Sequence, residues 1–278
     1  MAHDGFVVPA IISSRLLRAL TIAATLAVAV LCMRGTADAA SPAPCSDVLV
    51  LGARGSGQEA SGTTADGGSG MGPQVFGVHQ RLVADLPGVS VTGVAVYYPA
   101  RGVEAIALDP GAYFSGLEEG VRSVRGTLRR QAAACPDQRF VLAGYSQGAM
   151  VMHRAVQDLI ASPTARSQDL RSRIDGVILI ADGDRRADDR VTSLGSAVGG
   201  RGISYADPAV SGVRGTRFPA SWRSKVVSVC NEADVICDYR GLLQQDSHGT
   251  GGVTVHIKSY TGAADVQHAA DLVAVRIR

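Results

Sequence analysis

Residues 144–148 read Gly144-Tyr145-Ser146-Gln147-Gly148, and the fold can be inferred from this stretch. It has the pattern G-x-S-x-G, follows the apolar run 140–143, and precedes an amphipathic stretch that starts at Ala149. A strand, a sharp turn and a helix in this order form a nucleophile elbow, in which the turn exposes a serine hydroxyl beside a helix N-terminus. A plain glycine-containing turn would give the same letters, but the strand before it and the helix after it favour Ser146 as a nucleophile for acyl transfer.

The rest of the chain alternates between short apolar runs and helical patterns. The runs are continuous rather than alternating, which is typical of parallel strands covered on both faces; they lie at 48–51, 91–98, 140–143, 177–180 and 226–229. Helices are expected at 75–86, from about 114 onward, at 147–160 and at 264–275. This order predicts an α/β fold with a central parallel five-stranded sheet and a site at the carboxyl ends of its strands. The polar segment 185–219 is expected to be loop-like, to contain a short helix, or to line the site.

The N-terminus has the features of a secretory signal peptide, which we assign to residues 1–39. Arg15 and Arg18 precede the uncharged run 19–33, and Ala37-Asp38-Ala39 offers a cleavage pattern. The run is shorter than the roughly 20 residues of a membrane span, although an uncleaved anchor is the alternative. Cleavage after Ala39 or Ala40 would leave one domain, 40–278, without a transmembrane span.

Charge and cysteine content narrow the class of protein. Without residues 1–39 the chain carries 24 basic and 23 acidic side chains, and this balance argues against nucleic acid as a partner. Its four cysteines suggest two disulfides in an exported protein. Cys230 and Cys237 are close in sequence and are expected to pair, which leaves Cys45 with Cys135. A zinc site is disfavoured because no C-x2-C spacing occurs, and we expect neither metal nor cofactor.

A serine nucleophile needs a base, and in this fold the base follows the serine and the acid in the chain. The histidines after Ser146 are His153, His248, His256 and His268. His153 lies two turns into the helix after the elbow and His268 lies within the last helix, so both are expected to be structural. His256, between a loop and the C-terminal helix, is favoured over His248, which stays open.

The candidate acid is Asp234, because it lies within 230–237, where a short disulfide loop would hold a carboxylate rigidly. Asp182 and Asp184, at the end of the fourth predicted strand, are the alternatives, with a turn or helix cap as their ordinary role.

The tetrahedral intermediate of acyl transfer needs an oxyanion hole. One donor is expected to be the backbone N–H of Gln147, the residue after the nucleophile. The second is expected from the loop 53–57 after the first strand, where Ser56 offers its N–H and its hydroxyl.

These residues together resemble the cutinase family of α/β-hydrolase serine esterases, in particular its exported actinobacterial branch. The motifs that carry the resemblance are Ala-Arg-Gly-Ser at 53–56, Tyr-Pro-Ala at 98–100, Cys135-Pro136, Gly-Tyr-Ser-Gln-Gly at 144–148, and Cys-Asn-x-x-Asp-x-x-Cys at 230–237. The resemblance implies a three-layer sandwich, Ser146 as nucleophile, Asp234 as acid, and Ser56 with Gln147 as oxyanion donors. It also implies the Cys45–Cys135 and Cys230–Cys237 bridges.

The family base usually precedes a Ser-Tyr pair more closely than His256 precedes Ser259-Tyr260. This departure is a further reason to keep His248 as an alternative. The resemblance implies a secreted or envelope-associated carboxylic-ester hydrolase that forms an acyl-enzyme with lipid, polyester (cutin-like) or cell-envelope esters. We expect a monomer. The alternative is a catalytically silent protein that keeps the fold for binding.

Overall fold

A computed structural model describes residues 42–60, 68–197 and 199–278. The signal peptide assigned to 1–39 therefore lies outside the described residues. Among the helices within them, none combines the length and the apolar character that a membrane crossing requires.

The centre of the fold is one sheet of six strands, all paired in parallel. The strands are β1 (Val48–Ala53), β2 (Val91–Ala95), β3 (Arg139–Tyr145), β4 (Ile174–Ile180), β5 (Thr192–Leu194) and β6 (Val226–Val229). Their order across the sheet is β2-β1-β3-β4-β6-β5. The predicted parallel sheet is confirmed, with one strand more than expected, because the edge strand β5 lies within the segment predicted as loop-like. Its three residues contain no apolar run, so periodicity gave no signal for it.

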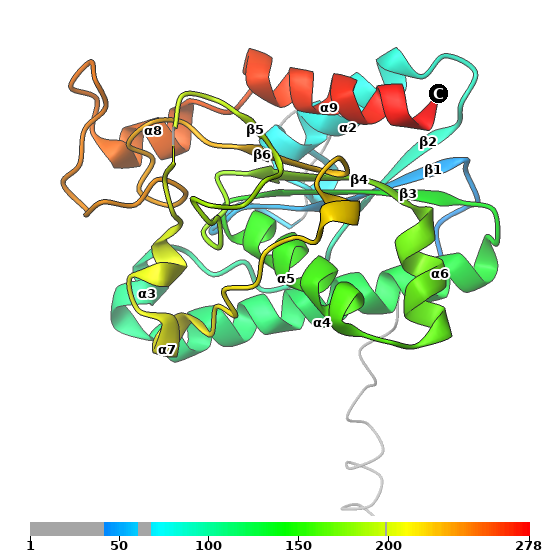
Figure 1. The fold of residues 1–278 in the computed structure, drawn as a ribbon, viewed down its shortest axis with the longest axis horizontal. Helices are drawn as coiled ribbons and strands as arrows, with labels where there is room; N and C mark the ends of the chain where they lie inside the picture. Colours follow the sequence, from blue (N-terminus) through cyan, green and yellow to red (C-terminus); the bar gives the residue numbers. More distant parts are fainter. Residues whose placement is uncertain (1–41, 61–67, 198) are drawn as a thin grey trace, which may run out of the picture. The chain divides into compact units, whose positions relative to one another are not determined.

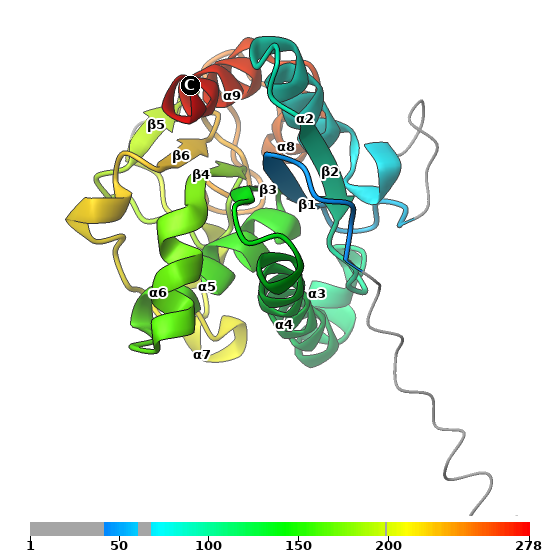
Figure 2. The same ribbon diagram turned by 90° about the vertical axis from the view of Figure 1, so that its right-hand side faces the viewer.

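Helices cover both faces of the sheet, which makes a three-layer sandwich (Figures 1 and 2). One face carries α2 (Pro73–Asp85) and α9 (Ala264–Ile277), and the other carries α4 (Pro110–Ala134), α5 (Gln147–Ala161) and α6 (Ala165–Arg173). The short helices are α3 (Glu104–Leu108), α7 (Pro208–Ser211) and α8 (Gly252–Lys258), with 3-10 turns at Gly68–Gly70, Ile203–Tyr205 and Ala220–Trp222.

Alternate residues of each central strand enter different hydrophobic layers. In β1, Leu49 and Leu51 join the layer formed with α4 and α5, whereas Val48 and Val50 join the layer formed with α2 and α9. Both sets are buried, since helices lie on each side. This double burial explains why the strands appear in the sequence as continuous apolar runs.

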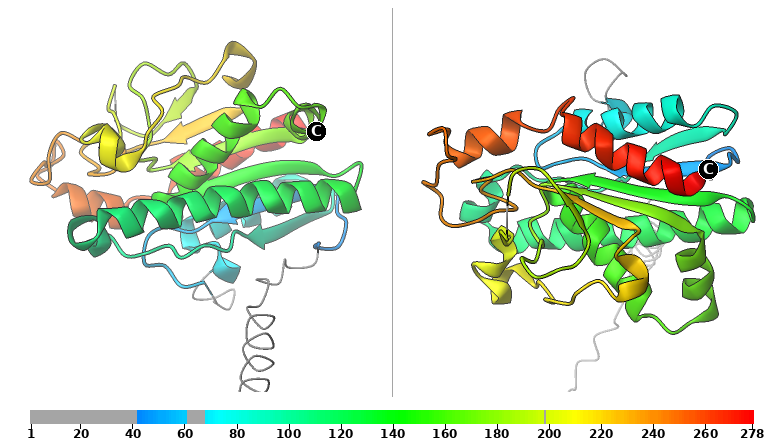
Figure 3. Two further views of the ribbon diagram at one scale, coloured as in Figure 1. Left: turned by 90° about the horizontal axis from the view of Figure 1, so that it is seen from below. Right: turned by 45° about the horizontal axis from the view of Figure 1, so that its top comes forward.

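The carboxyl ends of the strands meet at one end of the sheet. Ala53 at the end of β1 is paired with Gly144 near the end of β3, so the segments that follow both strands emerge side by side. Helices α3 and α8 lie at this same end, beside the start of α5 (Figures 1 and 3). Residues that are distant in the sequence are thereby gathered at one edge.

Two disulfides tie the chain to this framework. Cys45, just before β1, is joined to Cys135 at the end of α4, across 90 positions of sequence. Cys230 and Cys237 close a short loop directly after β6.

Candidate active site

Ser146 occupies the turn between β3 and α5, in a backbone conformation that side-chain-bearing residues rarely adopt. Its φ is 55° and its ψ is −120°. The glycines on either side permit this turn, because a Cβ on Gly144 would lie 2.3 Å from the carbonyl oxygen of Gly148, and one on Gly148 would lie 2.1 Å from that of Ala53. The G-x-S-x-G pattern is therefore set by close backbone approach, and it leaves the serine at the N-terminus of α5.

His256 joins Ser146 to Asp234 through two hydrogen-bonded contacts. The His256 Nε2 atom lies 3.0 Å from the Ser146 hydroxyl oxygen, and its Nδ1 lies 3.0 and 3.1 Å from the two carboxylate oxygens of Asp234. With a proton on Nδ1, the ring donates to the carboxylate and leaves Nε2 free to accept the serine proton. All three side chains are buried.

The Asp234 carboxylate is held from several directions. Its Oδ1 accepts from the backbone N–H groups of Ile236 and Cys237, at 2.6 and 3.2 Å. Its Oδ2 accepts from the Tyr260 hydroxyl at 2.7 Å. Burial and the adjacent carboxylate of Asp234 raise the pKa of Tyr260 well above its usual value, so its hydroxyl remains a donor. Together with the Cys230–Cys237 bridge, these bonds fix the orientation of the Asp234 carboxylate.

The imidazole of His256 is fixed by an aromatic neighbour. It stacks on the ring of Tyr145, with centroids 5.2 Å apart and an interplanar angle of 16°. The Tyr145 hydroxyl also donates to the backbone carbonyl of His256 at 2.7 Å. A residue of the elbow motif thus holds His256, the candidate base, in place. Motif reasoning gave Tyr145 no role, although it stands next to the nucleophile.

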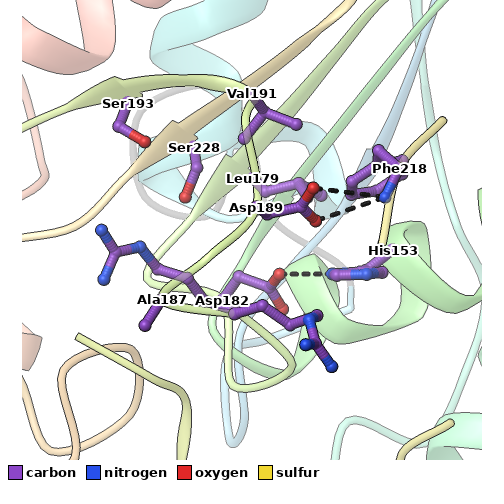
Figure 4. A pocket seen from close by; sticks show the side chains of 11 residues that line it. His153, Leu179, Asp182, Ala187, Asp189, Val191, Ser193, Phe218 and Ser228 are labelled. Atoms are coloured by element: carbon purple, nitrogen blue, oxygen red, sulfur yellow. Dashed lines mark hydrogen bonds and ion pairs between the residues drawn. The ribbon is translucent and has the colours of Figure 1, made fainter. Parts of the chain in front are cut away.

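The competing histidines lie elsewhere. His248 is exposed in a turn, where its backbone N–H donates to Asp246, and His268 is exposed on α9. His153 is buried in α5 and forms a contact of 2.6 Å with Asp182 (Figure 4). Burial alone would lower the pKa of His153, but the Asp182 carboxylate outweighs it, so the pKa is raised.

The two alternative acids, Asp182 and Asp184, are both paired with side chains of α5. Asp182 bonds His153, beside a small cavity of about 30 Å³ that Phe218 and Ser228 also line (Figure 4). Asp184 accepts from the Arg154 guanidinium at 2.6 Å. These ion pairs join α5 to the turn that precedes the segment 185–219. The segment itself contacts α5 through Arg214, which pairs with Asp158, and through the carbonyl of Thr216, which accepts from the Gln157 side chain.

The predicted oxyanion donors lie on adjoining backbone. The N–H of Gln147 is the first in α5 and has no preceding helical carbonyl to bond. The loop that carries Ser56 is pinned by the N–H of Gly55, which donates to Gln58 Oε1 at 2.7 Å, and by the N–H of Gly57, which donates to the Ala100 carbonyl at 2.8 Å. The close fit of Gly148 against Ala53 brings the two segments together.

No group of three or more histidine, cysteine or acidic side chains within residues 42–60, 68–197 and 199–278 is arranged to hold a metal ion.

Comparison with known proteins identifies the family. The cutinase family model matches residues 44–276, which is most of the chain. The chain belongs to the cutinase family. Members of the cutinase family are carboxylic ester hydrolases, and the chain is therefore an ester hydrolase of this family.

Individual relatives of the cutinase family agree with this assignment. Cutinase CUT2 of Pyricularia oryzae is 28% identical over 219 residues, which cover 78% of this chain and 79% of the relative. A cutinase of the bacterium Kineococcus radiotolerans is 31% identical over 233 residues, covering 83% of this chain and 63% of the relative. A solved cutinase-like protein from Cryptococcus sp. has the same fold, with a TM-score of 0.57, 20% identity, and coverage of 86% and 98% of the two chains.

Proposed function

We propose that this cutinase-family chain is a secreted serine esterase that works through an acyl-enzyme. The observation that carries the proposal is the relay of contacts from Ser146 through His256 to Asp234, with a distance of 3.0 Å at the nucleophile. A serine whose hydroxyl faces a histidine nitrogen, with a carboxylate on the other side of the ring, has what nucleophilic catalysis requires.

In the first half of the reaction the Ser146 oxygen bonds to the ester carbonyl carbon while its proton passes to His256 Nε2. The resulting oxyanion accepts hydrogen bonds from the N–H of Gln147 and from Ser56. Collapse of this intermediate breaks the bond to the alkoxy group, which leaves as an alcohol with the proton from His256. Asp234 accepts from His256 Nδ1 and stabilises the imidazolium during both steps.

In the second half a water molecule attacks the acyl carbonyl. His256 takes the proton of the water, and the Ser146 oxygen leaves and recovers that proton. The product is a carboxylic acid and the free enzyme. Each half of the reaction uses the same base and the same oxyanion donors.

The surface around the nucleophile favours an apolar ester. Side chains on α8 and on the loop before it are exposed in spite of being aliphatic, and Leu243 is 96% exposed. This set comprises Leu242, Leu243, Val253 and Ile257, and Leu108 of α3 adds an exposed side chain at the same end of the sheet. Exposed apolar groups on the helix that carries the proposed base, and on the loop before it, suit lipid, polyester or envelope esters better than charged ones. We therefore propose such esters as the substrates.

Export is the remaining part of the proposal. Two disulfides suit an oxidising compartment, and residues 1–39 have the composition of a signal peptide. We propose that the domain acts outside the cell, free or attached to the envelope.

The test uses a fluorophosphonate probe and a short p-nitrophenyl ester on the purified mature chain. Ser146→Ala is expected to lose the label and to lower kcat by about 10⁶-fold, as removal of a triad serine does elsewhere. His256→Ala is expected to lose label and turnover, whereas His248→Ala, the matched histidine control, is expected to keep both. Mass mapping should find the label on Ser146.

Three outcomes would contradict the proposal, each in a different way. Label and turnover that survive in Ser146→Ala would remove the serine mechanism altogether. Loss in His248→Ala with retention in His256→Ala would move the base and keep the enzyme class. A wild-type chain without label or turnover would instead favour a binding protein that keeps the fold.

A further inference from the structure

A tyrosine contacts the candidate oxyanion serine. Tyr113 lies in the first turn of α4, is only 2% exposed, and places its hydroxyl 3.0 Å from the Ser56 hydroxyl oxygen. Within the part of the chain that the structure describes, Ser56 is the one hydrogen-bond partner of the Tyr113 hydroxyl. The sequence patterns singled out neither this residue nor this contact.

The direction of this hydrogen bond follows from the chemistry of the two hydroxyls. Burial raises the pKa of Tyr113 to about 12, so the phenol keeps its proton at any pH at which an esterase is assayed. A phenolic O–H is a much stronger acid than an aliphatic one, and the stronger acid is the better donor. Tyr113 therefore donates to the Ser56 oxygen, and the proton of Ser56 is left for another acceptor.

Other contacts fix the backbone of the loop but leave the Ser56 side chain free to rotate. The bonds from Gly55 and Gly57 hold main-chain atoms only. Among residues 42–60, 68–197 and 199–278, the hydrogen bond that restrains the side chain comes from Tyr113. Tyr113 is itself anchored because Asp109 caps the start of α4, accepting from the Ala112 N–H at 2.9 Å. A buried, helix-anchored donor thus selects the orientation of the serine hydroxyl.

We propose that Tyr113 is a positioning residue of the oxyanion hole: it donates to Ser56 and so aims the Ser56 proton at the carbonyl oxygen of the substrate. This inference rests on the proposed esterase function. When the oxyanion forms, two hydrogen bonds in series, from Tyr113 to Ser56 and from Ser56 to the oxyanion, polarise each other. The backbone carbonyl of Tyr113 also accepts from the Gln147 side chain at 3.5 Å, so the same residue contacts both predicted oxyanion donors.

The test is a double-mutant cycle with Tyr113→Phe and Ser56→Ala, assayed with p-nitrophenyl butyrate. Ser56→Ala is expected to lower kcat by about 100-fold with little change in KM, as loss of one oxyanion donor does. Tyr113→Phe removes a single oxygen atom and is expected to lower kcat by about tenfold with KM unchanged. The double variant is expected to match Ser56→Ala, because Tyr113 acts only through the Ser56 hydroxyl.

Tyr98→Phe is the matched control. The Tyr98 hydroxyl is also buried and donates to the carbonyl of Arg54 in the same loop, but it forms no hydrogen bond with Ser56. Its effect on kcat is expected to multiply with that of Ser56→Ala. A thermal melt of each variant separates loss of folding from loss of rate, and Ser56→Thr, which restores a hydroxyl, should recover rate only while Tyr113 is present.

The inference is overturned if Tyr113→Phe keeps the wild-type kcat. It is also overturned if Tyr113→Phe lowers kcat by the same factor with and without Ser56, or if Ser56→Thr recovers rate equally well in the Tyr113→Phe background. Each of these results leaves fluorophosphonate labelling of Ser146 intact and so spares the proposed function. A wild-type chain that neither labels nor turns over ester would overturn both.

Discussion

Removing each disulfide in turn should separate stability from catalysis. Cys45→Ala/Cys135→Ala opens a bridge between the start of β1 and the end of α4, at the end of the sheet opposite to the carboxyl ends of β1 and β3. Cys230→Ala/Cys237→Ala opens the short loop that holds Asp234. The first pair should act on folding alone, and the second should act on both folding and turnover.

The magnitudes follow from the lengths of the closed loops. A bridge that spans 90 positions removes enough chain entropy from the unfolded state to stabilise the fold by ~4.6 kcal/mol. The same relation gives ~2.4 kcal/mol for the separation of 7, to which the lost packing of two fully buried sulfur atoms adds. A misplacement of about 1 Å at Asp234 would lower kcat by about 100-fold.

The assay combines urea denaturation with ester hydrolysis at a temperature where every variant is folded. Cys45→Ala/Cys135→Ala is expected to show the larger decrease in the free energy of unfolding from loop closure and to keep the wild-type kcat. Cys230→Ala/Cys237→Ala is expected to have a lower kcat than the wild type at a temperature where it is still folded. Full kcat in the second variant would refute the claim that the bridge orients Asp234, and an unchanged free energy of unfolding in the first would refute the loop-closure reasoning.

Two further predictions concern hydrogen bonds to buried acids. Tyr260→Phe removes a donor to Asp234 and should lower kcat/KM about tenfold, or ~1.4 kcal/mol, because the carboxylate is then less firmly oriented toward His256. An unchanged kcat/KM would contradict this role. His153 has a raised pKa in the fold, so its pairing stabilises the fold below its ordinary pKa of about 6.5, and this contribution is lost as pH rises through the folded pKa. His153→Gln should therefore flatten the fall in the free energy of unfolding between pH 6 and 9, and an equal slope in both chains would count against it.

The sequence predicts well what depends on buried apolar pattern. All five predicted strands occur. Four of them, β1, β3, β4 and β6, are buried along nearly their whole length because helices cover both faces, whereas β2 at the edge of the sheet is half-buried. The strand β5 and the helix α6 were not predicted, because neither has an apolar pattern that marks a buried face. Thr192–Leu194 pairs through its backbone at the edge of the sheet, and the sequence of α6, ARSQDLRSR, has few apolar residues to mark a buried face. Edge strands that pair through the backbone and helices that are mostly polar therefore have only a weak signal in the sequence.

In the candidate site, too, features that depend on adjacent residues could be predicted from the sequence, and features that depend on distant residues could not. The turn at Ser146 could be predicted because the elbow imposes steric demands on adjacent residues of the chain. The partners of Ser146 depend on contacts across about 110 residues, so spacing alone left Asp182 and Asp184 as alternatives to Asp234. Only the three-dimensional contacts with His153 and Arg154 show that those two carboxylates are engaged elsewhere.

The extra residue between His256 and the Ser259-Tyr260 pair has a structural explanation. Helix α8 ends at Lys258, and Ser259 keeps helical backbone angles, so His256 and Tyr260 are separated by about one turn. Positions three and four residues apart return to the same face of a helix, so one added residue does not turn Tyr260 away from the acid. Both side chains bond Asp234, and the Tyr260 hydroxyl also accepts from the N–H of Asn231 in the disulfide loop. The spacing that made His256 doubtful in the sequence is therefore compatible with a base and a tyrosine that act on the same carboxylate.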